Sequence, residues 1–243
     1  MLIIGPCSIE SKSQAFRIAE FVQRQGATHF RGGAFKGQNR PIVTGKPEYL
    51  GLGEEGVKIL AQVQDEFKFP CICDVQSKEQ AYLVAKYNIK IMMVGTRNMD
   101  NLCLLRDIRY LYDTYNPKGQ IILKRGPSAT VDEWIGAAEH LGGEDRVVLC
   151  ERGISSFDRT PQTRWRLDFV GVAYVKKYTN LINDFPAIQE LIHWNVFTIE
   201  EFKEGVKAKG TLVYKEIVKN KRIIKGAELF YNIVAEVGTI EQD

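Results

Sequence analysis

The sequence predicts an α/β protein, a (β/α)8 TIM barrel whose last two strands are divergent or incomplete. The chain has 243 residues, close to the roughly 250 residues that are typical of this barrel. Over the first 155 residues, short runs that are apolar on both faces alternate six times with amphipathic stretches. Such runs suit parallel strands buried between helices. Because parallel strands need right-handed crossovers, six units in sequence favour a barrel over an open doubly wound sheet.

The six apolar runs are the expected strands. They are rich in Ile and Val, and each ends near Gly, Cys or charged residues. They span residues 2–4, 28–30, 70–73, 89–94, 120–123 and 147–150.

The segments between the runs have the spacing of helices. In the first segment, Ala15, Ile18, Ala19 and Val22 fall on one helical face, and Gly26 ends the pattern. The same spacing recurs over residues 57–63 and 134–141. Each apolar face is expected to cover the sheet from outside.

After residue 180 the pattern changes, so we divide the chain into a barrel portion, 1–180, and a divergent segment, 181–243. This segment either closes the barrel or forms an appended helix and hairpin. We expect, in order, a helix capped by Asp184 and running to about Trp194, a second from Thr198 to Gly210, a hairpin over 212–224, and a strand-like run over 229–237.

Composition excludes several classes of protein. With 44% hydrophobic residues the chain can build a large core, and no apolar run reaches the roughly 18 residues of a membrane span. There is no basic and apolar leader of the secretory kind, and the five cysteines are an odd number, so we expect free thiols in the cytoplasm. A net charge of +3 is too small to indicate nucleic-acid binding by itself.

Cationic residues recur where the predicted strands end. In a βα barrel that end carries the active site. Arginine binds phosphate and carboxylate groups through two hydrogen bonds, so a ring of such side chains predicts a site for a small substrate with several negative charges. The ring consists of Arg31, Lys36, Arg97, Lys124 and Arg152. Cys7 follows the first run and Asp74 the third.

Six motifs in order carry a resemblance to a known family. They are residues 5–11, 31–36, 51–54, 95–99, 123–126 and 149–154. The motifs resemble those of 3-deoxy-D-arabino-heptulosonate 7-phosphate (DAHP) synthase of the type Iβ branch, within the group that includes KDO-8-phosphate synthase. The resemblance extends from residue 2 to about residue 180. The C-terminal quarter diverges from this pattern.

The resemblance implies condensation of phosphoenolpyruvate with erythrose 4-phosphate, in aromatic amino acid biosynthesis by the shikimate pathway, with a divalent metal (Mn, Fe, Co or Zn). Carried over by position, Arg97 and Arg152 hold the phosphate of phosphoenolpyruvate. Arg31, Lys36 and Lys124 surround its carboxylate and reacting end. The catalytic residues are then Lys124, Lys36 and Glu151, and Glu151 and Asp74 order a water molecule or the lysines.

The departures from the family concern the metal and the sugar phosphate. Cys7 is one metal ligand by resemblance, but the seventh-strand Asp-Pro-Ser-His is missing, which leaves His193, Glu236 and Asp184 as its candidate partners. The loop after Lys36 differs from the family's Pro-Arg-Thr-Ser-Pro. The candidates for the sugar phosphate are Asn39, Arg40 and Arg164.

Three hypotheses follow. The chain is a metal-dependent transferase, or a non-catalytic relative that binds phosphoenolpyruvate but has lost the metal and sugar-phosphate half of the site. In the third, the basic segment 203–225 binds nucleic acid or an acidic surface, although glutamates dilute its charge. The resemblance also implies a homo-oligomer.

Overall fold

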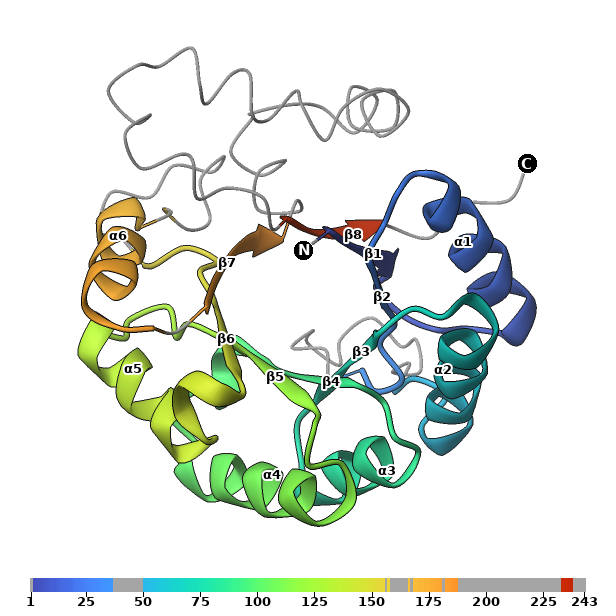
Figure 1. Cartoon of the computed structure of the whole chain (residues 1–243), viewed down its shortest axis with the longest axis horizontal. Coiled ribbons are helices and arrows are strands. Elements are labelled where there is room, and N and C mark those ends of the chain that lie inside the picture. Colours follow the sequence, from blue (N-terminus) through green and yellow to red (C-terminus); the bar gives the residue numbers. More distant parts are fainter. Residues whose placement is uncertain are drawn as a thin grey trace, which may run out of the picture.

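The fold is a closed barrel of parallel strands in the order β1 to β8 (Figure 1). The computed structural model describes residues 2–36, 50–155, 157, 166, 168–180, 182–187 and 233–237, with the last two strands described by their backbone. The strands are β1 (Leu2–Pro6), β2 (His29–Arg31), β3 (Cys71–Val75), β4 (Ile91–Val94), β5 (Gln120–Lys124), β6 (Val147–Cys150), β7 (Ile182–Ala187) and β8 (Ile233–Val237). The predicted barrel is confirmed.

Helices form a layer outside the strands (Figure 1). They are α1 (Lys12–Arg24), α2 (Glu54–Phe67), α3 (Lys78–Lys86), α4 (Leu102–Tyr115), α5 (Val131–His140) and α6 (Phe169–Tyr178), with short 3-10 turns η2 (Thr96–Asn98) and η3 (Gly143–Asp145). Polar side chains begin several of them. Thr130 and Glu133 form a reciprocal capping box at α5, and Asp168 caps α6 by accepting the Gly171 N–H.

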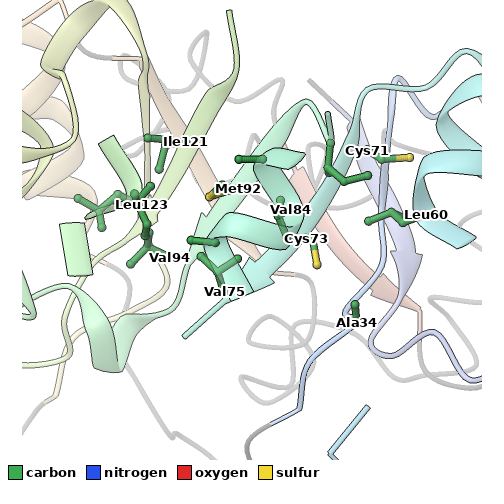
Figure 2. Close-up of a cluster of buried hydrophobic side chains, with 14 of the residues drawn as sticks. Ala34, Leu60, Cys71, Cys73, Val75, Val84, Met92, Val94, Ile121 and Leu123 are labelled. Atoms are coloured by element: carbon green, nitrogen blue, oxygen red, sulfur yellow. The ribbon is translucent and has the colours of Figure 1, made fainter. Parts of the chain in front are cut away.

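Alternation along the strands separates two apolar cores. One set of side chains fills the barrel interior and consists of Ile3, Ile72, Ile91, Met93, Ile122, Val148 and Cys150. The opposite set packs between the sheet and the helices, where Figure 2 shows Val75, Val94 and Leu123 in one cluster. Because side chains of a strand alternate between the two faces, β1, β3, β4, β5 and β6 each contribute to both cores.

The expected helix at Asp184 is wrong, because residues 182–187 form strand β7. Its backbone pairs in parallel with β6, placing Asp184 in register with Cys150. The local signals for a helix, a capping Asp and an early Pro, are overridden by pairing with the open edge of β6. The register between β7 and β8 shifts between Phe185 and Ala187, around Pro186, whose missing N–H favours an irregularity.

Strand β8 lies within the predicted strand-like run and completes the ring. It pairs with β1 from Leu2↔Ile233 to Pro6↔Val237, which puts Glu236 in register with Gly5. In the part of the chain that is described, no helix combines the length and apolarity needed to cross a membrane.

Candidate active site at the carboxyl ends of the strands

Among the predicted site residues whose side chains the structure describes, three lie inside strands rather than in the loops after them. Arg31 ends β2, Lys124 ends β5, and Asp74 is the fourth residue of β3. Ile72 and Ile122, two positions earlier, belong to the core of the barrel interior. The two-residue period of a strand therefore turns Asp74 and Lys124 inward as well, one layer nearer the carboxyl ends.

Asp74 joins two of the cations. Its Oδ2 accepts hydrogen bonds from Arg31 Nη2 at 2.7 Å and Nε at 3.2 Å, and its Oδ1 lies 4.0 Å from Lys124 Nζ. Burial raises the pKa of the Asp74 carboxyl, but the charges of Arg31, Lys124 and Lys36 outweigh it and lower the pKa to about 2. Asp74 is thus ionised, and a positive excess remains around it for a substrate anion.

Cys7 and Lys36 form a second contact at this mouth. Lys36 Nζ donates to Cys7 Sγ at 2.6 Å, which joins the end of β1 to the segment after β2. Two glycines allow this approach. A Cβ on Gly33 would lie 2.5 Å from the Cys7 carbonyl oxygen, and one on Gly5 would lie 1.9 Å from that of Arg31.

The remaining two cations follow β4 and β6. Arg97 is exposed in the η2 turn, and no ion pair with it is found among residues 2–36 and 50–155. Arg152 is half-buried in the turn after β6. The ends of four strands thus carry the predicted cations, and Asp74 joins two of them, Arg31 and Lys124.

Arg125, which was not among the predicted site residues, makes several polar contacts beside the mouth of the barrel. It follows Lys124 and turns into the wall, where Nη1 donates to Glu151 Oε2 at 3.1 Å and to Asp168 Oδ2 at 2.7 Å. Glu151 is fully buried. Burial raises the pKa of its carboxyl, against the opposing effects of the Gly153 N–H and Arg125. The sequence did contain a signal for this role of Arg125. Because successive side chains of a strand point to opposite faces, the residue directly after the inward-facing Lys124 is expected to point into the wall of the barrel.

Among the described residues, no group of three or more His, Cys, Asp or Glu side chains could hold a metal ion. The Cys7 sulfur accepts a hydrogen bond from the Lys36 ammonium group, which is not a metal ligand. The described side chains therefore do not by themselves fit a metal. The side chains of Asp184 and Glu236 lie outside those described, as do His193, Asn39, Arg40, Arg164 and the basic segment 203–225.

A groove of about 420 Å³ lies elsewhere, on the outer surface along α4 and the end of α5. Both acidic and basic side chains line it. Its lining residues are Arg106, Arg109, Tyr110, Asp113, Glu139 and His140. It does not include any of the predicted site residues.

Comparisons with known proteins identify the family of this chain. The sequence model of the DAHP synthetase I family matches residues 1–186. A phospho-2-dehydro-3-deoxyheptonate aldolase of Thermotoga maritima is 31% identical over 182 residues, which cover 74% of this chain and 50% of that protein. A 2-dehydro-3-deoxyphosphooctonate aldolase of Bordetella petrii is 34% identical over 165 residues, 63% of this chain and 55% of that protein. The chain spans about half the length of these curated relatives.

Solved structures give the same result for the fold. The crystal structure of the DAHP synthase of Thermotoga maritima superposes with a TM-score of 0.71 at 25% identity, over 98% of this chain and 59% of that one. A truncated form of the 3-deoxy-D-arabino-heptulosonate 7-phosphate synthase from the same organism gives 0.69 at 25% identity, over 98% of this chain and 74% of that one. The resemblance inferred from the motifs is thereby confirmed.

Proposed function

This chain belongs to the DAHP synthetase I family, and from that premise we propose that it condenses phosphoenolpyruvate with a phosphorylated aldose. We propose erythrose 4-phosphate as the aldose. The observation that carries the proposal is the cluster of Arg31, Lys124 and Lys36 around one ionised carboxylate at the carboxyl ends of the strands. A cluster with more cations than anions suits a small substrate with several negative charges.

We assign the two ends of phosphoenolpyruvate to different cations. The family resemblance assigns Arg97 and Arg152 to its phosphate, and both follow strand ends without being deeply buried. Arg31, Lys36 and Lys124 bind the carboxylate and line the reacting carbons from the interior side. In this assignment Asp74 is a positioning residue, because it holds Arg31 by two hydrogen bonds and lies 4.0 Å from the Lys124 ammonium.

The reaction forms one carbon–carbon bond and one carbon–oxygen bond to the oxygen of water, and it breaks the carbon–oxygen bond to the phosphate, which leaves with the proton of the added hydroxyl as the ketone forms. The methylene carbon of phosphoenolpyruvate attacks the aldehyde carbon, and the aldehyde oxygen takes up a proton. Water adds to the resulting cationic carbon and loses a proton, after which inorganic phosphate leaves. Lys124 and Lys36 act as hydrogen-bond donors to the oxygens that gain negative charge, and the cation cluster holds both anions in attacking geometry.

The resemblance further assigns a divalent metal to this mouth, with Cys7 as one ligand and His193, Glu236 and Asp184 as its candidate partners. Because the described side chains do not make a metal site, no step above passes through a metal. We retain Cys7 as the proposed ligand, and Asn39, Arg40 and Arg164 as the proposed sugar-phosphate residues.

Two aldoses compete under this proposal. A heptonate product contains the three carbons of phosphoenolpyruvate plus a four-carbon aldose, whereas an octonate product needs a five-carbon aldose. Relatives of both names match this chain at 31% and 34% identity. The stretch from Arg31 to Lys36 resembles the heptulosonate branch, and it therefore favours erythrose 4-phosphate.

The test is titration of the EDTA-stripped protein with phosphoenolpyruvate, followed by assay of phosphate release with four-carbon and five-carbon aldose phosphates, each with and without Mn²⁺. Phosphoenolpyruvate binding with turnover of erythrose 4-phosphate supports the proposal. Binding without turnover of either aldose would show instead a non-catalytic relative that retains half of the site. Absence of phosphoenolpyruvate binding would overturn both.

A further inference from the structure

The side chain of Arg125 ties together three segments behind the mouth of the barrel. Its Nε and Nη2 donate to the Ala129 carbonyl oxygen at 3.2 and 2.9 Å, in the segment between β5 and α5. Its Nη1 reaches Glu151 after β6 and Asp168 at the start of α6. The guanidinium also packs over the Trp134 ring, 5.6 Å from its centroid. Arg125 is only 3% exposed, so solvent does not compete for these bonds.

Glu151 uses both of its carboxylate oxygens within this arrangement. Oε2 accepts from Arg125 at 3.1 Å, and Oε1 accepts the backbone N–H of Gly153 at 2.5 Å. The second bond closes a ring around residue 152, whose neighbours on both sides are then held. Gly153 has a φ of 97°, a conformation that favours glycine, so the shape of this turn requires a glycine at position 153.

The same residues also hold the two strand ends that carry proposed substrate ligands. The backbone N–H of Arg125 donates to the Cys150 carbonyl oxygen at 3.1 Å, and Lys124 is in register with Cys150. Lys124 therefore directly precedes Arg125, whose side chain is held by these bonds. Arg152 lies inside the turn that the bond between Glu151 and Gly153 closes.

We propose that Arg125 and Glu151 are positioning residues for the substrate phosphate. Arg125 holds the Glu151 carboxylate, and Glu151 holds the turn from which Arg152 reaches the mouth. This inference rests on the proposed function, in which Arg152 binds the phosphate of phosphoenolpyruvate. It also changes the role expected for Glu151: a fully buried carboxylate with both oxygens bonded to Arg125 and Gly153 acts through the turn, not on the reacting atoms.

The experiment compares phosphoenolpyruvate dissociation constants, by calorimetry, for the wild type and the variants E151A, E151Q and D168N, together with KM and kcat where turnover is found. E151A removes the acceptor of the Gly153 N–H, and we expect it to weaken phosphoenolpyruvate binding about tenfold, because a displaced binding group is costly. E151Q keeps an acceptor oxygen, and we expect it to recover most of that loss. In both variants KM changes more than kcat.

D168N is the matched control. It removes the other carboxylate bonded to Arg125 Nη1 but leaves the bond to Glu151, and Asn still caps a helix. We expect its dissociation constant to stay within about twofold of the wild type, since the turn at Arg152 is untouched. Where E151A is insoluble, R125K takes its place, because lysine keeps the charge but lacks the fork that reaches Glu151 and Ala129 together.

The outcomes separate the two proposals. A folded wild type that does not bind phosphoenolpyruvate overturns the proposed function. A wild type that binds, with E151A binding equally well, overturns the positioning role alone. If E151Q loses kcat as fully as E151A while both bind phosphoenolpyruvate normally, Glu151 is instead an acid–base catalyst and the positioning role is wrong.

Discussion

Lys36 Nζ and Cys7 Sγ lie 2.6 Å apart, although the two residues belong to different βα units. The contact exists because Gly33 brings its backbone against the Cys7 carbonyl. It places a thiol, the group expected to bind a metal, next to an ammonium expected to bind phosphoenolpyruvate. The proposed metal ligand and a proposed substrate ligand are therefore neighbours but different residues. Replacing Cys7 or a cation alone tests metal binding and phosphoenolpyruvate binding separately.

Replacing Cys7 by Ala should abolish Mn²⁺ binding by the EDTA-stripped protein and leave phosphoenolpyruvate binding within about threefold of the wild type, since the cations carry the latter. Calorimetric titration of each ligand measures both. C103A is the matched control, because Cys103 is exposed on α4, and it should bind both ligands normally. Undiminished Mn²⁺ binding by C7A would remove Cys7 from the metal site.

Replacing Lys124 by Met should lower kcat/KM for phosphoenolpyruvate by about a hundredfold, the usual effect of losing one donor to developing charge. Lys124 is buried at the mouth, where its charge is shielded from solvent. Steady-state kinetics and the rise in Tm on adding phosphoenolpyruvate provide the measurement. K118M changes an exposed lysine and should behave like the wild type. Equal kinetics for the two variants would exclude Lys124 from the site.

Replacing Asp74 by Asn should destabilise the protein in a pH-dependent way. Folding lowers the pKa of Asp74 from its ordinary 3.8 to about 2. A carboxyl whose pKa is lowered by folding stabilises the native state at pH values above its pKa in the unfolded state. This stabilisation is lost as the pH falls to its pKa in the folded state. The shift corresponds to about 2 kcal/mol at neutral pH.

Urea denaturation of wild type and D74N from pH 7 to pH 3 tests this. The difference in free energy of unfolding should be largest at neutral pH and shrink below about pH 4. The control is D107N, which breaks the exposed ion pair with Lys78 and should cost less than about 1 kcal/mol at every pH. A D74N difference that is constant with pH would show that the carboxylate charge contributes nothing.

Two glycines should respond oppositely to replacement by Ala. At Gly5 a Cβ would lie 1.9 Å from the Arg31 carbonyl oxygen, so G5A must move backbone and should cost more than about 2 kcal/mol of stability. At Gly136 in α5 a Cβ meets nothing within 4 Å, and G136A should stabilise by about 0.5–1 kcal/mol. Urea unfolding compares them. A neutral G5A would mean that β1 and β2 are less close than described.

Much of the barrel was predictable because its signals are local. Two-sided apolar runs such as Ile91–Val94 and the apolar faces of α1 and α5 depend only on spacing within one segment. The grouping of Arg31 and Lys124 was also predictable in outline, since parallel strands in a barrel end at one face. The run that contains β8 was recognised for the same reason.

The sequence by itself determined the βα alternation, the family, and the set of cations at the strand ends. The tertiary structure decided that residues 182–187 are a strand, because the open edge of β6 outweighs a local capping signal. It also decided the partners of charged groups: Asp74 bonds Arg31 across 43 positions of sequence, and Arg125 bonds Asp168 across the same separation. Such contacts form only once the strands are in register, because no spacing rule within a segment specifies which buried charge a distant residue will meet.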